Sequence, residues 1–157
     1  MNGQPSFEIR RAVWEDLPLL AEIEREAFAD PWSAAVLATE LQHACARVWL
    51  GGSPGAPSAG YAGFRWTGPE GELLRLAVVP GERRRGLAAA LLEAGLGYLR
   101  EQEAEVCHLE VRADNVPAIA LYDRFSFRVV GRRSGYYPGG VDALLMSVPL
   151  AVSGGMI

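Results

Sequence analysis

The sequence is short of cysteine and histidine and has no long apolar segment, and each shortage excludes a class of protein. Its only cysteines are Cys45 and Cys107 and its only histidines are His43 and His108, at spacings that match no disulfide framework or metal site. We therefore expect no disulfide and no metal ion. No apolar run approaches the roughly 20 residues of a membrane-spanning helix, and the chain does not open on a basic segment followed by an apolar one. These absences predict a cytoplasmic protein with no membrane partner.

An excess of positive charge is missing as well. The chain carries 15 basic and 19 acidic residues, for a formal net charge of −4 at pH 7. Because binding of nucleic acid usually requires a basic face, we expect no nucleic-acid partner. A basic peptide or an amine is a better electrostatic match.

The chain does contain enough apolar residues for a hydrophobic core. It has 157 residues, of which 50% are hydrophobic and 22% charged, as is typical of one globular domain. No internal repeat or linker divides it. We expect a single domain over residues 1–150, acting as a monomer, and a flexible tail over residues 151–157.

Hydrophobic periodicity and turn residues predict seven strands and four helices. The strands are expected at residues 7–10, 47–50, 61–66, 72–79, 106–112, 128–132 and 143–150, and the helices at 16–28, 33–44, 87–102 and 115–125. Residues 51–60 and 135–140 are rich in glycine and proline and are expected to be loops. This order of elements predicts an α/β sandwich with a central mixed, mostly antiparallel sheet flanked by the helices.

Some residues are expected to cap or pack these helices. Asp16, Ser33 and Asn115 precede helix starts and can cap them. The inner face of the second helix is predicted to contain Val36, Leu37, Leu41 and Ala44. Gly95 and Gly97 weaken the third helix, so close packing against the sheet is the predicted reason for both.

The most informative stretch runs from Leu76 to Ala88. An apolar strand ends at Pro80, three consecutive arginines follow, and an alanine- and leucine-rich helix begins after Gly86. The first N–H groups of such a helix lack intrahelical partners and lie at the positive end of its dipole, an arrangement that holds phosphate groups. We therefore expect an anion site. The arginines also fit a solvated run of charge, and any pyrophosphate could bind, although the G-x-G-x-x-G spacing of dinucleotide-binding proteins is missing.

The pattern Arg83-x-x-Gly86-x-Ala88 resembles the acetyl-CoA signature of the GNAT superfamily of N-acetyltransferases. Five further segments, in the family's order, are similar to the RimI-type ribosomal-protein-alanine N-acetyltransferases. They are Asp30-Pro31-Trp32-Ser33, Leu109-Glu110-Val111-Arg112-Ala113-Asp114-Asn115, Ala120-Leu121-Tyr122, Gly135-Tyr136-Tyr137-Pro138 and Asp142-Ala143-Leu144-Leu145-Met146. The chain departs from the family at Ser126, where a glycine is usual, and at Val141, where an acidic residue is common.

The resemblance implies a GNAT-type fold and a role for each matching residue. Glu110 matches the general base and Tyr122 the general acid, while Trp32, Tyr136 and Tyr137 lie in loops that flank the acceptor peptide. The residues implied to contact acetyl-CoA, the cosubstrate, are Leu76, Ala77, Val78, Arg83, Arg84, Arg85, Gly86, Leu87, Ala88, Ala89 and Asn115. The family also offers a backbone N–H, at Val78 in this chain, as the oxyanion donor.

Acetyl transfer requires a base for the amine, a donor to the oxyanion and an acid for the departing thiolate. Alternation along residues 106–112 places Glu110 and His108 on the polar face of a strand, so His108 is an alternative base. Glu110 also fits a surface carboxylate paired with Arg112. Cys107 lies on the opposite face, where a buried structural thiol is expected rather than a nucleophile.

The remaining candidates have structural alternatives too. Tyr122 follows Asn115 by seven residues, so the two share a helix face. Tyr122 nevertheless fits the apolar stripe of its helix, and Asn115 fits a simple cap. The aromatic residues in the loops could instead close the ends of the core.

The predicted function is transfer of acetyl from acetyl-CoA to the α-amine of a small N-terminal residue, with alanine expected, of a ribosomal protein. An α-amine has a pKa of about 8 and a lysine amine one of about 10.4, so the α-amine needs the weaker base. Two alternatives remain. They are acetylation of a small amine, such as a polyamine or an amino sugar, and binding of CoA without turnover.

Overall fold

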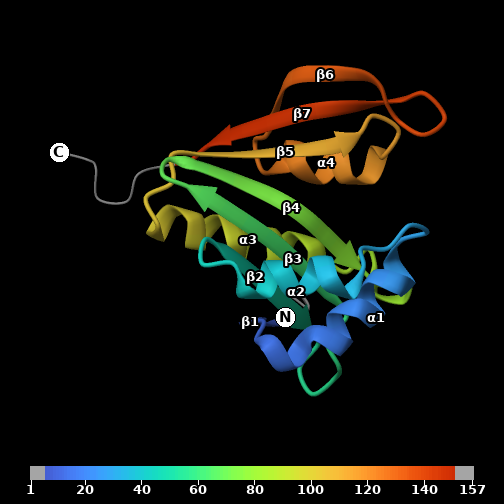
Figure 1. The fold of residues 1–157 in the computed structure, drawn as a ribbon, viewed down its shortest axis with the longest axis vertical. Helices are drawn as coiled ribbons and strands as arrows, with labels where there is room; N and C mark the ends of the chain where they lie inside the picture. The colour runs from blue at the N-terminus through green and yellow to red at the C-terminus, as the bar shows by residue number, and fades with distance from the viewer. Residues whose placement is uncertain (1–5, 151–157) are drawn as a thin grey trace, which may run out of the picture. The chain divides into compact units, whose positions relative to one another are not determined.

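The computed structural model describes residues 6–150 and has a mixed α/β architecture (Figure 1). The strands are β1 Glu8–Arg11, β2 Ala46–Gly52, β3 Gly60–Thr67, β4 Glu70–Val78, β5 Val106–Arg112, β6 Arg128–Tyr137 and β7 Val141–Pro149. The α-helices are α1 Leu17–Ala27, α2 Ala34–Gln42, α3 Leu87–Glu101 and α4 Val116–Arg124, and the short 3₁₀ helices are η1 Trp14–Asp16 and η2 Pro80–Glu82. Within these residues the predicted seven strands and four helices are confirmed. The predicted tail at residues 151–157 lies outside them.

The strands pair in the order β1-β2-β3-β4-β5-β7-β6. The β4–β5 pair is parallel, and the β1–β2, β2–β3, β5–β7 and β6–β7 pairs are antiparallel, so the predicted mixed, mostly antiparallel sheet is confirmed. The chain divides into two compact units. Unit 1 contains the described part of Met1–Arg65 together with Arg75–Tyr98, and unit 2 contains Trp66–Leu74 together with the described part of Leu99–Ile157. The single domain expected over residues 1–150 stays a prediction.

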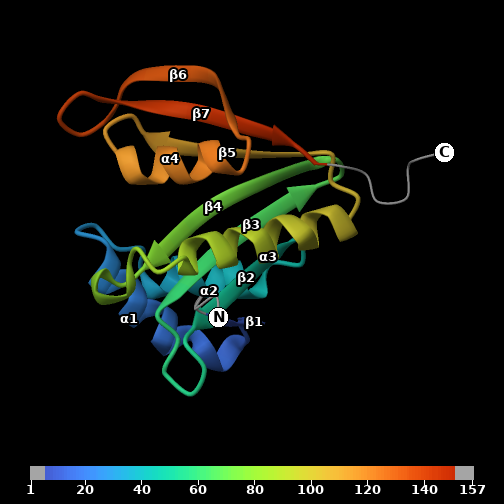
Figure 2. The ribbon, with the colours of Figure 1, turned by 180° about the vertical axis from the view of Figure 1, so that it is seen from behind.

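Helices cover both faces of the sheet in unit 1 (Figure 2). On one face, α1, α2 and the strands share a buried cluster formed by Leu20, Ile23, Leu37, Val48, Leu50, Tyr61 and Ala77. On the other face, α3 lies over β2, since a Cβ on Gly51 would be 3.0 Å from Leu87 Cδ1 and 3.2 Å from Leu91 Cδ2. Each large apolar side chain buried in this way contributes about 1.5–3 kcal/mol. These contacts hold α3, and the turn before it, against the sheet.

Gly95 of α3 lies directly against Phe64 of β3. A Cβ at this position would come within 1.9 Å of Phe64 Cε2, so only glycine lets the helix lie this close to the strand. The predicted close packing is therefore confirmed for Gly95. It is wrong for Gly97, because no described atom outside the helix lies within 4 Å of where a Cβ would be.

Strand β5 is the centre of unit 2. It pairs with the start of β4 on one side and with β7 on the other, and β6 pairs with β7. The predicted alternation is confirmed, since Cys107, Leu109 and Val111 are buried while the residues between them are partly or fully exposed. Tyr122 of α4 and Phe127 pack ring against ring, with centroids 5.7 Å apart. The apolar face of β5 is therefore core, and the face with Glu110 is open to solvent.

Two of the three predicted helix caps are confirmed. Ser33 Oγ accepts a hydrogen bond of 3.2 Å from an N–H in the first turn of α2, and Asn115 Oδ1 accepts one of 3.3 Å in the first turn of α4. Asp16 occupies the N-cap position of α1, as predicted, but its side chain makes no capping hydrogen bond. Its carboxylate accepts the Val13 N–H at 2.7 Å and the Arg10 guanidinium at 2.8 Å, so it serves the segment before α1 rather than the helix.

The predicted inner face of α2 is only partly right. Leu37 is buried, but Val36 is 40% exposed. The helix ends before Ala44, which is exposed. The buried stripe instead includes Glu40, whose carboxylate is paired with Arg65 of β3. Glu40 therefore takes a buried position that apolar periodicity does not predict.

Strand β6 is longer than predicted. It continues to Tyr137, so the loop expected at residues 135–140 shrinks to a turn at residues 138–140. Register shifts between Val129 and Gly131 and between Arg133 and Tyr137 let the strand accommodate Gly135, whose φ is +59°. Gly135 therefore marks an irregularity within the strand, and the turn that ends the strand is confined to residues 138–140.

Ser126 follows α4 in the left-handed backbone region, with φ of 71°. This conformation costs a residue with a side chain about 1–2 kcal/mol, whereas glycine adopts it readily after a helix. We predict that Ser126→Gly raises the free energy of unfolding by about 0.5–1 kcal/mol, measured by urea denaturation. Ser53→Gly is the control, because Ser53 lies in a loop without a positive φ and gains nothing from glycine. A less stable Ser126→Gly protein would contradict the prediction.

Candidate active site

The turn between β4 and α3 in unit 1 has the predicted form of an anion site. Arg84 and Gly86 have positive φ values of 66° and 92°, and α3 begins at Leu87. The hydrogen bond from Ala90 N–H to Gly86 C=O, at 3.0 Å, is the first of the helix. The N–H groups of the three residues before Ala90 therefore have no intrahelical partner and lie at the positive end of the helix dipole.

These features fit a phosphate-bearing molecule such as CoA. Gly86 lacks a side chain, and a Cβ there would have only Phe7 within 4 Å, at 3.8 Å, among the described residues. The backbone of the turn is thus open to a ligand. Unpaired N–H groups at the start of a helix bind phosphate oxygens without any further device.

The three arginines of the turn have different partners. Arg83 donates from Nε to Val78 C=O at 2.9 Å and from Nη2 to Ala27 C=O at 3.1 Å. Arg85 pairs with Glu82 at 3.2 Å. Arg84 has no hydrogen bond or ion pair with another of the residues 6–150. The Arg83 side chain therefore links the turn to the end of β4 and to α1 by hydrogen bonds. Of the three arginines, Arg84 has the guanidinium that is available to a ligand.

Unit 1 contains a buried ionic cluster that the sequence patterns do not predict. Glu24 of α1 is fully buried and pairs with Arg75 of β4, from Nε at 2.9 Å and from Nη2 at 2.8 Å. Its carboxylate also accepts hydrogen bonds from the Tyr61 hydroxyl and, at 2.8 Å, from the Trp32 N–H. Burial alone would raise the pKa of Glu24, but these donors outweigh it and hold the pKa below its usual value. Burial and the neighbouring carboxylate raise the pKa of Tyr61.

Trp32, predicted to contact the acceptor, is held by this cluster. The Arg75 guanidinium lies over the Phe28 ring, 3.8 Å from its centroid, and 4.8 Å from the centroid of Trp32. Together with the bond from Trp32 N–H to Glu24, these contacts fix both the backbone and the ring of Trp32. The loop after α1 is therefore anchored on the sheet.

Glu110, the predicted base, lies in unit 2 on the open face of β5. Its side chain is 30% exposed and pairs with Arg133 of β6 at 3.3 Å. The alternative partner, Arg112, is wrong, because Arg112 pairs with Asp114 at 3.0 Å. The carboxylate is thus accessible and held by one cation.

The two tyrosines predicted to contact the peptide are linked to that cation. Arg133 lies over the ring of Tyr136 at 5.5 Å, and Tyr136 meets Tyr137 edge to face at 5.1 Å. Arg112 lies over the ring of Tyr137 at 5.1 Å. Tyr136 is 53% exposed, so it is not a plug for the core.

Tyr122, the predicted acid, is 7% exposed in α4. Burial, and secondarily the nearby Cys107, raise the pKa of Tyr122 to about 12. The phenol is therefore protonated at neutral pH, as a proton donor must be, and its hydroxyl makes no hydrogen bond within residues 6–150. Asn115 caps α4 through Oδ1, which leaves its Nδ2 group available to donate.

The structure also bears on the alternative catalytic groups. Cys107 is fully buried, and burial raises the pKa of its thiol to about 12, which disfavours a nucleophilic role. His108 contacts Ser147 Oγ through Nδ1 at 2.6 Å and Glu70 Oε1 through Nε2 at 2.9 Å. Both of its ring nitrogens are engaged, whereas Glu110 pairs through Oε1 with Arg133 alone, so Glu110 is the better candidate.

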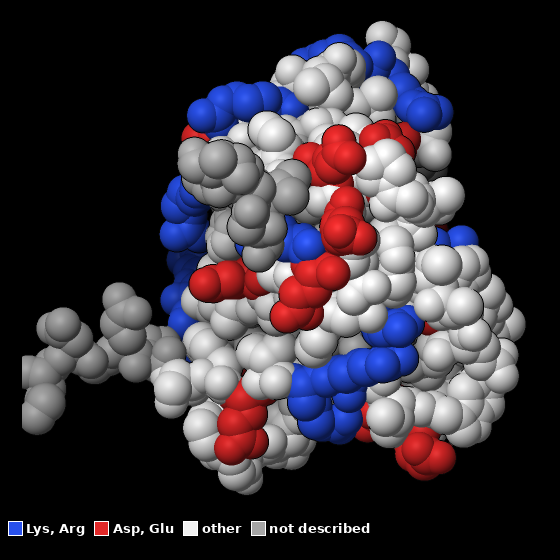
Figure 3. All heavy atoms as spheres, turned by 90° about the vertical axis from the view of Figure 1, so that its left-hand side faces the viewer, with Lys and Arg blue, Asp and Glu red and all other residues white. Residues whose placement is uncertain are grey.

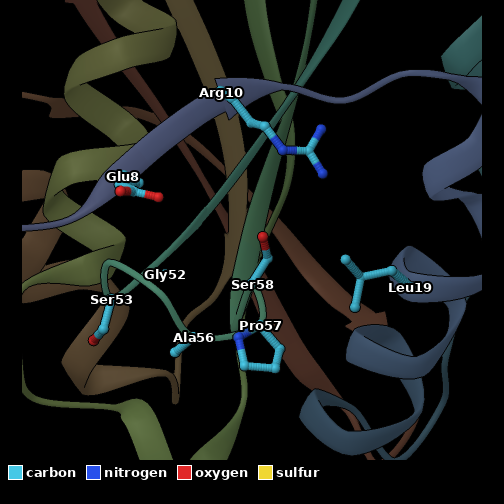
Figure 4. A pocket seen from close by; sticks show the side chains of 8 residues that line it. All are labelled: Glu8, Arg10, Leu19, Gly52, Ser53, Ala56, Pro57 and Ser58. Carbon is cyan, nitrogen blue, oxygen red and sulfur yellow. The ribbon is translucent and has the colours of Figure 1, made fainter.

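A cavity in unit 1 lies apart from the predicted residues. It has a volume of about 380 Å³ and is lined by Glu8, Arg10, Leu19, Gly52, Ser53, Ala56, Pro57 and Ser58 (Figure 4). The Arg10 guanidinium is paired with Asp16 at 2.8 Å, so it is not free to bind an anion there. None of the sequence-predicted site residues lines this cavity.

The predicted residues divide between the two units. Unit 1 contains Trp32, Leu76, Ala77, Val78 and residues 83–89, and unit 2 contains Glu110, Asn115, Tyr122, Tyr136 and Tyr137. Within residues 6–150 no three His, Cys, Asp or Glu side chains gather as a metal site, and no helix is long and apolar enough to cross a membrane. Acidic and basic side chains intermingle on the face shown in Figure 3.

Comparison with known proteins places the chain in a family. It matches the model of the acetyltransferase (GNAT) family over residues 9–127. It is 34% identical over 140 residues to the ribosomal protein bS18-alanine N-acetyltransferase of Escherichia coli K12, covering 87% of this chain and 93% of that one.

Solved structures agree. The ribosomal-protein-S18-alanine N-acetyltransferase from Escherichia coli matches with a TM-score of 0.88 and 33% identity, over 97% of this chain and 99% of that one. Arabidopsis thaliana NAA60, solved with a bisubstrate analogue, matches with a TM-score of 0.82 and 25% identity, over 94% and 100%. The chain therefore belongs to the GNAT family and is an acetyl-CoA-dependent N-acetyltransferase.

Proposed function

We propose that this enzyme transfers acetyl from acetyl-CoA to the α-amine of an N-terminal alanine of a ribosomal protein, by direct transfer in a ternary complex. The observation that carries the proposal is the 34% identity, over 87% of the chain, to the bS18-alanine enzyme. We also propose that it acts as a monomer in the cytoplasm.

The residues of this chain divide the work of the reaction. Glu110 accepts the proton of the attacking amine as the C–N bond forms, directly or through water. The N–H of Val78 donates to the oxyanion, and Tyr122 gives its proton to the thiolate as the C–S bond breaks. Acetyl-CoA supplies the activated acyl group. Its binding residues are Leu76, Ala77, Val78, Arg83, Arg84, Arg85, Gly86, Leu87, Ala88, Ala89 and Asn115.

The pKa of the amine supports a carboxylate as the base. An α-amine titrates at about 8, so part of it is already neutral at physiological pH and a carboxylate suffices as base. Burial raises the pKa of the Tyr122 phenol to about 12, so the phenol carries its proton at physiological pH. Trp32, Tyr136 and Tyr137 are the proposed contacts of the peptide.

A peptide assay tests the acceptor. The protein is incubated with acetyl-CoA and a peptide that begins with alanine and contains an internal lysine, and the acetylated position is found by mass spectrometry. We expect acetyl on the α-amine. Because the enzyme contains no lysine, it contributes no competing lysine amine. Acetylation of the peptide lysine alone, or preference for a polyamine or amino sugar added in competition, would refute the proposal.

Removing the hydroxyl of Tyr122 is expected to lower kcat by about 100-fold, since general acids accelerate such reactions by about 10²–10⁴-fold. Tyr122→Phe keeps the ring that packs on Phe127, so the protein is expected to fold. The measurement is the steady-state rate of CoA release. Tyr98→Phe is the control, and unchanged turnover in Tyr122→Phe would exclude the role of acid.

Tyr122→Phe is also expected to change how the free energy of unfolding depends on pH above 10. A pKa raised from 10.0 to about 12 in the folded protein means that the folded state loses stability as the pH rises from 10 through 12. Tyr122→Phe lacks this group and is expected to lose less stability over that range, measured by urea denaturation. An identical pH dependence in both proteins would contradict the buried phenol.

A further inference from the structure

Arg75 lies in β4, directly before Leu76. Its side chain is directed to the face of unit 1 that α1 covers, because it pairs there with Glu24 and packs on Phe28. Its position is thus beside the segment proposed to hold acetyl-CoA, on the face that also carries Trp32. No pattern in the sequence singles out this residue.

The ion pair fixes the orientation of the guanidinium. Nε and Nη2 of Arg75 each donate to a different oxygen of Glu24, at 2.9 and 2.8 Å. Such a two-bond pair is planar and directional, unlike the single contact that a lysine would make. Glu24 has no exposure and Arg75 only 20%, so water competes weakly for either group.

The oriented guanidinium in turn holds the loop after α1. It stacks 3.8 Å from the centroid of Phe28 and 4.8 Å from that of Trp32. The same carboxylate that orients Arg75 accepts the Trp32 N–H at 2.8 Å. Backbone and ring of Trp32 therefore depend on one buried pair.

We infer that Arg75 is a positioning residue for the acceptor peptide, acting through Trp32. The inference rests on the proposed function, in which Trp32 contacts the peptide. Arg75 does not move a proton or touch acetyl-CoA in this role. It keeps the Trp32 ring in the orientation that the peptide requires. The loop is then already ordered before the peptide binds, so binding loses less conformational entropy.

The chain provides a matched control in the same unit. Arg65 of β3 makes the same two-bond pair with a shielded carboxylate, Glu40, from Nε at 2.9 Å and from Nη2 at 2.6 Å. Its partner lies near the end of α2 rather than beside the bond to Trp32. Arg65→Lys therefore measures how much activity or stability is lost when any ion pair of this kind is weakened.

The test compares Arg75→Lys with Arg65→Lys in the peptide assay. Lysine retains the charge but loses the planar stack and the second hydrogen bond. For Arg75→Lys we expect the KM for the alanine peptide to rise about tenfold, with kcat and the KM for acetyl-CoA within about twofold of the original. For Arg65→Lys all three constants are expected to stay within about twofold.

A double variant tests whether Arg75 acts through Trp32 or only stabilises the fold. Trp32→Ala alone is expected to raise the peptide KM, and adding Arg75→Lys should then raise it no further, because both changes remove one interaction. If Arg75→Lys does not fold, Phe28→Leu removes one side of the stack while leaving the ion pair intact, and is expected to raise the peptide KM about threefold.

An unchanged peptide KM in a folded Arg75→Lys protein, or independent effects in the double variant, would overturn the inference. So would an unchanged KM in Phe28→Leu. Failure of the proposed function is seen separately, because the unaltered protein would then fail to acetylate the α-amine of the peptide.

Discussion

Glu110→Gln is expected to lower kcat/KM for an alanine peptide by about 10²–10⁴-fold, the range of general base catalysis. Glutamine keeps the shape of the side chain and can still accept a hydrogen bond from Arg133, which pairs with Glu110 at 3.3 Å. It cannot take the proton of the amine. The measurement is the initial rate of CoA release, with the urea midpoint as a check that the fold is retained.

The pH dependence of this variant carries further information. Above a pH of about 8 most of an α-amine is neutral without help, so the deficit of Glu110→Gln is expected to shrink as the pH rises. Glu72→Gln is the control, because Glu72 is an exposed carboxylate on the neighbouring strand, paired in register with His108. Full activity in Glu110→Gln together with a large loss in His108→Gln would transfer the role of base to His108.

Glu24→Gln is expected to lower the free energy of unfolding by about 3–5 kcal/mol, because it leaves Arg75 as a shielded charge without its counter-ion. This is a large share of the roughly 5–15 kcal/mol that stabilises a typical domain. Urea denaturation at pH 7 measures it. Glu40→Gln is the control, since its partner Arg65 is 35% exposed against 20% for Arg75 and water can solvate it better.

The dependence of stability on acid pH distinguishes loss of the Glu24–Arg75 ion pair from a change in packing. The pKa of Glu24 is lowered in the folded state, because its hydrogen bonds outweigh the cost of burial. Its contribution is therefore present above its ordinary pKa of 4.5 and is lost as the pH falls through the lower, folded value. Glu24→Gln should lack this part of the acid dependence. Equal losses in Glu24→Gln and Glu40→Gln, at neutral and at acid pH, would contradict the special role of the Glu24 pair.

Regular elements were predictable because their signals are local. The alternation along β5 and the strand, turn and helix around Gly86 depend on residues that are neighbours in sequence, and both match the structure. The exposure of Glu110 follows from the same alternation. The resemblance to the GNAT family then supplied roles that periodicity alone does not contain.

The long-range ion-pair partners of the candidate site residues were not predictable in this way. Arg75 and Glu24 are separated by 51 residues, and nothing in either segment points to the other. Arg133, the partner of Glu110, lies on β6 across β7, in a stretch whose last part was expected to be a loop. Long-range ion pairs depend on strand order and register, which local patterns do not specify.

Gly95 has a consequence for redesign of this enzyme. The distance between α3 and β3 is limited at Gly95, where even a methyl group would come within 1.9 Å of Phe64. The N–H groups proposed to bind phosphate lie at the start of the same helix. Any larger residue would have to displace the Phe64 ring or move the helix away from the strand. A library that varies only residues touching the cosubstrate would leave Gly95 unchanged, although Gly95 permits the close packing of the helix whose first N–H groups are proposed to bind phosphate.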